Sequence, residues 1–457
     1  MPIVESFVAL CLLLVLGHYL RMHIRLLQKL YLPSCVIGGL AGLIVVQVMQ
    51  RVGYPVESGW VPGWGKLPGF LINIVFACLF LGVRIPPLRI LARRAGPQLA
   101  YGQTVAWGQY VVGVGLTVAL LTPLFGVPAM FGGILPVGFE GGHGTAAGMG
   151  PVFEKLGWEA GKDFGLASAS AGIISAIVFG MVLVNWATRR GYTARRKDPE
   201  SVPEDDSIGV IPIDRRPSAG RLTVSSDAVE SFSLHLGVVG VAVLIGFGLK
   251  QGLVAVAQAA GQKTFIQIAD SFPLFPLCML GGLVVQLLED RFDRHHLIDV
   301  GLTRRIQNTA LDFLVVAAIA TIRIEMLYEG LAPFVIVVAA GIAWNVFCVV
   351  VLARRLLPNA WFERSIAEMG QSMGVTATGL LLLRVVDPDY ETPAADAFAS
   401  KQLLHEPFMG GGLWTSMAIP LLALWGPLPV LYIAVGAVTV WVAVLLILRG
   451  LRRPAAL

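Results

Sequence analysis

Long apolar runs, separated by short polar or basic loops, extend from one end of the chain to the other. A helix that crosses a bilayer needs about 20 mostly apolar residues. Two apolar stretches, about 127–157 and 358–386, are broken by glycine and polar residues, and we interpret each as a re-entrant hairpin. The spanning helices that the pattern predicts lie at about 4–20, 33–50, 67–84, 98–124, 164–188, 231–257, 272–288, 306–328, 332–352, 395–424 and 427–448.

Four short motifs recur in the same order in the two halves of the chain. The clearest is P-x-C-x-x-G-G-L, at 33–40 and again at 276–283. In the register that aligns Val83-Arg84-Ile85 with Ile322-Arg323-Ile324, Asn73 corresponds to Asp312. An odd number of spans per half indicates that the second half is inverted. The other pairs are Val83-Arg84-Ile85 with Ile322-Arg323-Ile324, Ala106-Trp107-Gly108-Gln109 with Ala343-Trp344-Asn345, and Thr145-Ala146-Ala147-Gly148 with Thr376-Ala377-Thr378-Gly379.

The fold class that follows is an all-α polytopic membrane protein. It has two inverted five-helix repeats, each with a re-entrant hairpin, and an additional C-terminal helix. The long polar stretch in the middle of the chain reads as a flexible cytoplasmic linker. The predicted divisions are the first repeat at 1–189, the linker at 190–228, the second repeat at 229–424, and the additional helix and tail at 425–457.

Composition and charge agree with a membrane protein. Of the 457 residues, 56% are hydrophobic and 14% are charged. The net charge of +5 comes from basic residues in alternate loops, which places the N-terminus outside and the C-terminus inside, and which suits lipid headgroups rather than nucleic acid. The five cysteines lie in apolar spans without C-x-x-C spacing, so we interpret them as buried apolar residues.

The first broken stretch carries Gly141, Gly142, His143, Gly144 and Thr145. Glycine lets the backbone turn tightly and approach a ligand, and a helix that begins there would direct free amides at a carboxylate. This stretch is a candidate substrate or ion site. The alternative is that the glycines are close-packing contacts between helices. The histidine either donates a hydrogen bond to the substrate or holds the loop.

The second broken stretch contains Gly374 and the hydroxyls of Ser372, Thr376 and Thr378. Neutral oxygens of this kind suit sodium, and the repeat pairs this stretch with the first one. We therefore assign Gly374, Thr376 and Thr378 to the candidate substrate site as well. The alternative is a packed helix whose hydroxyls bond back to the preceding turn.

Asp312 is the clearest acid in the middle of a predicted span. An ionisable group at that depth is costly and usually functional, so it either neutralises sodium or relays a proton. Asn73, Gln109 and Asn345 are neutral polar residues within spans, which interhelical hydrogen bonds explain equally well. The candidate sodium ligands are Asp312, Asn73, Ser372 and Thr376.

Residues 141–145 resemble the G-G-H-G-T signature of the bacterial sodium/glutamate symporter family. Leu32-Pro33 with Gly38-Gly39-Leu40, and Gly374 with Thr376-Ala377-Thr378, are similar to two further stretches of that family. The resemblance implies a homodimeric, multi-pass secondary transporter of the bacterial inner membrane. It implies sodium-coupled uptake of L-glutamate, or a related small anion, by an elevator-like movement of a core domain.

The sequence also departs from that family. Gln371 and Ser372 lie where better-known members have histidine and cysteine, so another small amino acid or a dicarboxylate stays open. One alternative is a proton-coupled or sodium/proton-exchanging carrier, with Asp312 as the titrating group. A membrane-embedded enzyme would need a nucleophile or a motif such as H-E-x-x-H, which the sequence lacks, so we expect no enzyme activity. A channel fits the paired broken helices less well.

Overall fold

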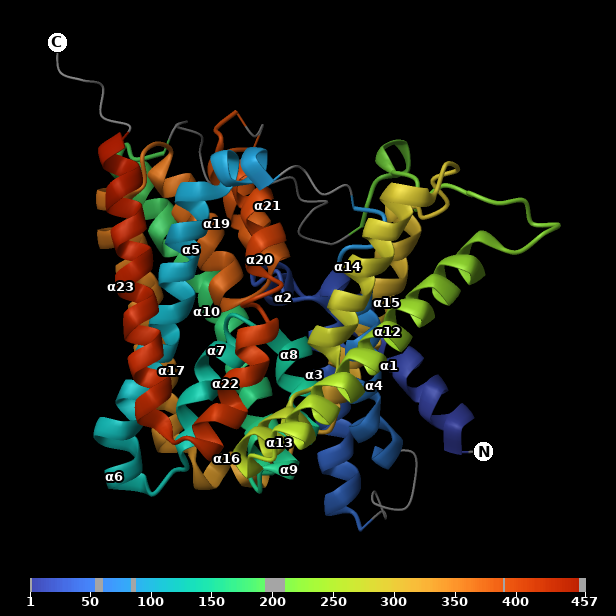
Figure 1. Ribbon diagram of the computed structural model, residues 1–457, viewed down its shortest axis with the longest axis horizontal. Helices are drawn as coiled ribbons and strands as arrows, with labels where there is room; N and C mark the ends of the chain where they lie inside the picture. The colour runs from blue at the N-terminus through green and yellow to red at the C-terminus, as the bar shows by residue number, and fades with distance from the viewer. Residues whose placement is uncertain (1, 54–60, 84–87, 194–209, 389–390, 452–457) are drawn as a thin grey trace. The chain divides into compact units, whose positions relative to one another are not determined.

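The computed structural model describes residues 2–53, 61–83, 88–193, 210–388 and 391–451. Within these ranges every regular element is a helix, which confirms the all-α prediction (Figure 1). Arg84 and residues 194–209 of the predicted linker lie outside the described residues. Seven helices are long and apolar enough to cross a membrane, namely Val4–His23, Ser34–Arg51, Ala95–Phe125, Ala160–Arg190, Ser231–Ala260, Leu331–Leu356 and Pro427–Gly450.

The chain divides into two compact units, and each unit combines segments from both halves of the sequence. Unit 1 comprises Met1–Ile85, Ala147–Gly157 and Asp205–Ile322. Unit 2 comprises Pro86–Ala146, Trp158–Glu204 and Arg323–Leu457. Each unit therefore contains parts of both predicted repeats. The boundaries of the repeats stay a prediction.

Unit 1 contains helices from both halves of the sequence, before and after the predicted linker. α13 and α14 follow one another with a bend of 71°. The helices are α1 (Pro2–His23), α2 (Arg25–Lys29), α3 (Ser34–Arg51), α4 (Val61–Ala77), α9 (Gly150–Lys155), α12 (Ser231–Ala260), α13 (Lys263–Ser271), α14 (Phe275–Phe292) and α15 (Val300–Ala320).

The two P-x-C-x-x-G-G-L motifs make corresponding contacts in unit 1. In each copy the first glycine packs on an earlier helix of the same half, and the second packs on a helix of the other half. A Cβ at any of these glycines would collide with its neighbour, so the close approach requires glycine. The contacts are Gly38 with Leu13 of α1, Gly39 with Ile319 of α15, Gly281 with Ala242 of α12, and Gly282 with Ala77 of α4.

Unit 2 contains the first broken stretch up to Ala146, the second broken stretch and the C-terminal helices. Both α5 and α17 pass through a π-helical segment, η2 and η6 respectively, soon after their matching Trp-containing motifs. The elements are α5 (Leu88–Leu116), η2 (Thr117–Leu121), α6 (Thr122–Phe125), η3 (Ala129–Gly133), α7 (Ile134–Gly138), α10 (Ala160–Arg190), α16 (Ile324–Glu329), α17 (Leu331–Phe347), η6 (Cys348–Ala353), α18 (Arg354–Leu356), α19 (Trp361–Met373), α20 (Thr376–Val386), α21 (Ala394–His405), α22 (Leu413–Leu424) and α23 (Pro427–Leu451). A further helix, α8 (Gly142–Gly148), begins in unit 2, and its last two residues belong to unit 1.

The stretch that the sequence predicts as one span, 395–424, is two helices. α21 ends at His405 and α22 begins at Leu413. Gly410 and Gly411 between them have φ of 47° and 92°, a conformation that a right-handed helix cannot contain. Apolar length alone predicted one helix here, whereas the proline and glycines between the two apolar segments interrupt it.

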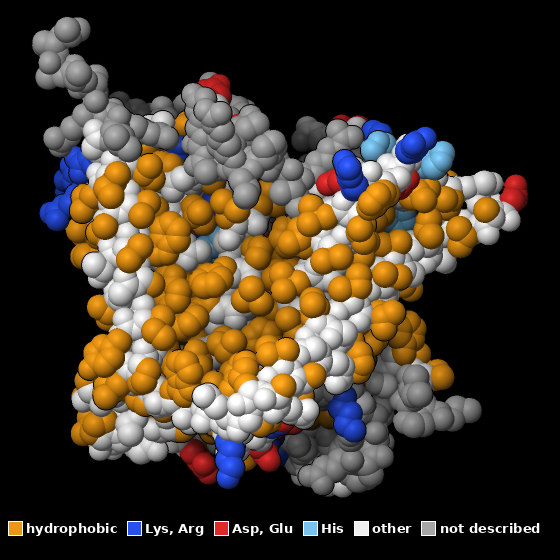
Figure 2. Space-filling model, in the orientation of Figure 1, with side chains coloured by type: hydrophobic (Ala, Val, Ile, Leu, Met, Phe, Trp, Pro, Cys, Tyr) orange, Lys and Arg blue, Asp and Glu red, His pale blue; other side chains and the backbone are white. Residues whose placement is uncertain are grey.

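Large apolar side chains are exposed on both units, as expected of helices that face lipid. Leu12 and Leu244 of unit 1 are 64% and 67% exposed, and Leu124 and Tyr432 of unit 2 are 65% and 70% exposed. Figure 2 shows hydrophobic side chains across the middle of the visible face, with lysine, arginine and acidic side chains toward its upper and lower edges.

Candidate functional site

The two broken stretches meet in unit 2. α7 and α8 are joined by the break Phe139–Gly141, and α19 and α20 by Gly374 and Val375. Gly142 has φ of 68°, and a Cβ there would lie 3.4 Å from the Gly374 carbonyl oxygen and 3.5 Å from Val375 Cγ1. The structure thus brings together the two loops that the sequence paired.

His143 holds the first loop against α10 in this conformation. It is 3% exposed, and its Nε2 lies 2.9 Å from Ser170 Oγ. The Ser170 hydroxyl donates to the Leu166 carbonyl at 3.0 Å, so it accepts a hydrogen bond from His143 Nε2–H. Thr145 is 1% exposed. Of the two roles that the sequence left open for His143, the contact with Ser170 matches that of holding the loop.

The neutral polar residues of α5 and α17 meet at the second loop. Gln109 Nε2 donates to the Ser372 carbonyl at 2.6 Å, and Ser372 Oγ donates to Asn345 Oδ1 at 2.7 Å. Two oxygens also lie near Gly374, because a Cβ there would lie 2.9 Å from the Gly370 carbonyl and 3.1 Å from Thr378 Oγ1, with Ile173 Cγ1 at 3.3 Å. This end of the loop is therefore lined with neutral oxygens.

Asp312 and Asn73 belong to unit 1, whereas Ser372 and Thr376 belong to unit 2. Asp312 lies close to Cys35. Asn73 Nδ2 donates to the Gly69 carbonyl at 2.8 Å, and Cys278 Sγ lies 3.9 Å from Asn73 Oδ1. Cys35 of the first half is therefore close to Asp312 of the second half, and Cys278 of the second half is close to Asn73 of the first half. The four candidate sodium ligands do not gather within one unit.

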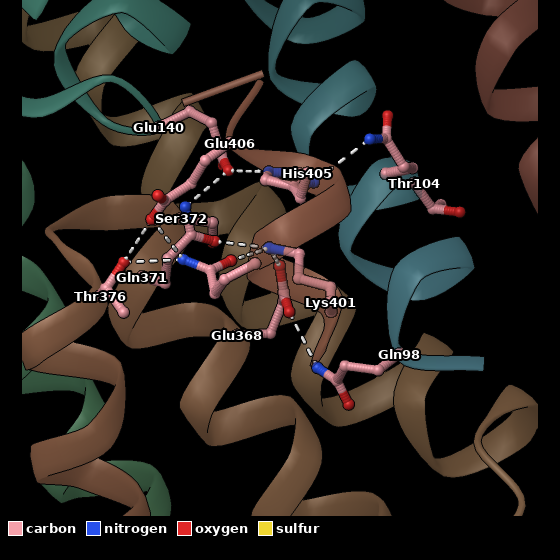
Figure 3. A network of polar contacts seen from close by, with 12 residues as sticks. Gln98, Thr104, Glu140, Glu368, Gln371, Ser372, Thr376, Lys401, His405 and Glu406 are labelled. Carbon is pink, nitrogen blue, oxygen red and sulfur yellow. Dashed lines mark hydrogen bonds and ion pairs between the residues drawn. The ribbon is translucent and has the colours of Figure 1, made fainter. Parts of the chain in front are cut away.

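A buried polar cluster, which the sequence analysis missed, lies beside the loops in unit 2 (Figure 3). Lys401 of α21 is fully buried, and its Nζ lies 2.7 Å from Glu368 Oε1. The same Nζ donates to Gln371 Oε1 and Gln402 Oε1, both at 2.9 Å. Lys401 thus makes two hydrogen bonds and one ion pair inside the cluster.

Glu140, directly before the first glycine motif, receives two hydrogen bonds on one oxygen. Gln371 Nε2 donates to its Oε1 at 2.8 Å, and His405 Nε2 donates to the same atom at 2.5 Å. Glu140 Oε2 is buried and has no hydrogen-bond partner in the described part of the chain. The residue is only 5% exposed.

Hydrogen bonds from Trp107 to Gln103 and from Gln103 to His405 determine which imidazole nitrogen of His405 carries the proton. Trp107 Nε1 donates to Gln103 Oε1 at 3.0 Å, so the amide nitrogen of Gln103 faces His405 Nδ1 at 3.3 Å. Because Nδ1 accepts that bond, the imidazole proton is on Nε2, and His405 is neutral while it donates to Glu140.

The cluster continues to the second loop. Gln402 Nε2 donates to Thr376 Oγ1 at 2.7 Å and to Glu406 Oε1 at 3.0 Å. Thr376 Oγ1 donates to Glu406 Oε1 at 2.9 Å. On the opposite side, Gln98 Nε2 donates to Glu368 Oε2 at 2.8 Å. Thr376 and Glu406 are half-buried, so the cluster reaches a partly accessible edge there.

A signal for this cluster was present in the sequence. Lys401 and His405 are four residues apart, as are Gln402 and Glu406, so each pair shares one helix face. Polar residues at this spacing in a membrane helix usually point inward and are functional. Because apolar residues lie on either side, the hydropathy pattern placed these polar residues within a single predicted span.

A family model described as sodium/glutamate symporter matches residues 1–391 of the chain. The match includes both broken loops, Glu140, Glu368 and Gln371, and it ends before α21, with Lys401 and His405, and before α22 and α23. No curated protein and no solved structure matches the chain.

Proposed function

Because the chain belongs to the sodium/glutamate symporter family, we propose that it moves glutamate with sodium across the cytoplasmic membrane, by an elevator-like alternation of unit 2 against unit 1. The observation that carries this proposal is the meeting of the two glycine-broken loops at Gly142 and Gly374. Paired broken helices from inverted repeats are the usual binding sites of alternating-access transporters.

In this proposal the glutamate carboxylates bind at the loop tips. α20 begins at Thr376, and no side chain caps its first turn in the described structure. The first N–H groups of a helix lack internal acceptors and favour an anion. The glycines at 141, 142 and 144 allow the substrate to approach the backbone of the first loop.

We assign sodium to the oxygens of the second loop, near Gly374 and Thr378. This assignment is supported by the neutral oxygens around Gly374 and by the link from Ser372 to Asn345. Asp312 and Asn73, in unit 1, are the alternative ligands. Each sodium ion that moves down a potential of about 100 mV contributes roughly 2.3 kcal/mol, so a few ions can concentrate an anion substantially.

A thermal-shift measurement on the purified protein tests binding and separates the two sodium assignments. Glutamate should raise the melting temperature in sodium but not in potassium. Thr378→Val keeps the shape of the side chain and removes the hydroxyl, so it should require more sodium for the same shift. Asp312→Asn should leave unchanged the sodium concentration needed for this shift. If that concentration changes in Asp312→Asn but not in Thr378→Val, the assignment is contradicted.

A further inference from the structure

Glu140 has a buried carboxylate oxygen, Oε2, that lacks a hydrogen-bond partner in the described part of the chain. Glu368 forms an ion pair with the Lys401 ammonium, and Glu406 lies at the half-buried edge. Glu140 receives N–H bonds only from a neutral amide and a neutral imidazole, and both end on Oε1. A buried carboxylate oxygen without a partner is costly unless a cation or a proton reaches it.

The charged and titratable groups that face Glu140 come from several elements. From α21 they are Lys401 and His405, with Glu406 directly after the helix. From α5 Tyr110 lies within electrostatic range of Glu140. From α19, Glu368 forms an ion pair with Lys401, and the Arg364 backbone carbonyl accepts a hydrogen bond from Gln98 Nε2. Lys401 is the one cation among those that face Glu140 directly in the described chain, and Glu368 already neutralises it.

We propose that Glu140 takes up a proton on Oε2 when glutamate binds, so that transport is coupled to protons as well as to sodium. This inference rests on the proposed function. An anion that enters the adjacent loops brings like charge close to Glu140 and so favours its protonation. By linkage, protonation favours substrate binding to the same extent. One O–H bond forms, the proton comes from water, and it leaves to water when the substrate is released.

A proton suits this position because it needs no coordination shell. The Glu140 side chain is 1% exposed and contacts His405 of α21. His405 positions the carboxylate through its Nε2–H, while Gln103 and Trp107 keep that tautomer in place. The proton site is therefore Glu140, and His405 is a positioning residue.

The first test is calorimetry of glutamate binding to the wild-type protein in sodium, in buffers with different heats of ionisation. The dependence of the observed heat on the buffer gives the number of protons taken up per glutamate. We expect a net uptake approaching one proton at neutral pH. Glutamate binding whose heat does not depend on the buffer would overturn the inference, and this test needs no variant to fold.

The second test measures flux in proteoliposomes that contain a pH-sensitive dye. With an inward sodium gradient, labelled glutamate uptake should acidify the lumen. Glu140→Gln keeps the acceptor oxygen and removes the titration, so acidification per glutamate should fall at least tenfold. His405→Gln should retain most of it. Acidification that survives Glu140→Gln, or that is lost only in His405→Gln, would overturn the assignment.

These experiments separate the two proposals. If wild-type protein accumulates glutamate in sodium without any lumenal pH change, the proton site fails while the proposed function stands. If Glu140→Gln raises the sodium concentration needed for uptake and wild type moves no protons, Glu140 serves sodium and the inference is overturned. If wild type takes up no glutamate in sodium, the proposed function itself fails.

Discussion

A lysine can stay fully buried in unit 2 because its ammonium group has a counter-charge and two hydrogen-bond acceptors. Glu368 supplies the counter-charge, and Gln371 and Gln402 supply the acceptors. Removing one partner of a buried pair leaves the other charge uncompensated, which typically costs 3–5 kcal/mol. The integrity of the cluster can therefore be measured through this pair.

Lys401→Met should lower stability by about 3–5 kcal/mol, because Glu368 then stays buried without its counter-charge. The melting temperature in detergent measures the loss. Adding Glu368→Gln to Lys401→Met should recover part of it, since the amide carries no charge. A single variant as stable as wild type, or a double variant less stable than Lys401→Met, would contradict the pairing.

At this scale the sequence located the loop residues but not all of their roles. Gly142 and Gly374 do meet, and Ser372 does bond to Asn345. The sequence could not give the contact of His143 with Ser170, which depends on the placement of α10. Lys401 and His405 were missed because hydropathy averages over a window, whereas their i, i+4 spacing was the useful signal.

At the scale of elements, the tip of the first loop depends on Gly142. Its φ of 68° is one that other residues adopt at a cost of roughly 1–2 kcal/mol. Its missing side chain also leaves room for Gly374 and Val375 of the second loop. Gly126 is a matched control, with φ of 66° and no atom within 4 Å of an added Cβ.

Gly142→Ala and Gly126→Ala should therefore destabilise the protein to a similar extent, by about 1–2 kcal/mol. Only Gly142→Ala should weaken glutamate binding and uptake, because its methyl group fills the space between the loop tips, at contact distance from Gly374 and Val375. Melting temperature and labelled uptake are measured on both variants. Equal uptake by the two variants would show that the contact between the loops is not needed for transport.

Sequence periodicity predicted the helices well and their interruptions less well. Both broken stretches appear as helix, break and helix, near the glycines that predicted them. The interruption at 406–412 was missed, although Pro407 and three glycines mark it, because apolar residues continue on either side. Hydropathy measures burial in lipid and does not record whether a backbone stays helical.

At the scale of the whole molecule, the linear halves and the spatial units differ. Each unit takes helices from both halves, and the repeated glycine motifs of unit 1 contact the opposite half. The repeat could be found from the sequence, but the grouping of helices into units could not. That grouping depends on contacts between residues more than two hundred positions apart, for which local patterns carry no signal.

The proposed elevator movement predicts a change in the distance between the units. Spin labels at Leu244 of unit 1 and Tyr432 of unit 2, both exposed, can be introduced after the five native cysteines are replaced. Their distance distribution should shift when sodium and glutamate are added together. Labels at Leu124 and Tyr432, both in unit 2, should not shift. A shift in both pairs, or in neither, would argue against rigid movement of unit 2.

The central claim is sodium-coupled glutamate transport, and radiolabelled glutamate uptake into proteoliposomes tests it most directly. With an inward sodium gradient, glutamate should accumulate above its external concentration, and dissipating the gradient should release it. With potassium in place of sodium, uptake should fall to the level of protein-free vesicles. Equal accumulation in sodium and potassium, or none in either with protein that is demonstrably folded, would contradict the claim.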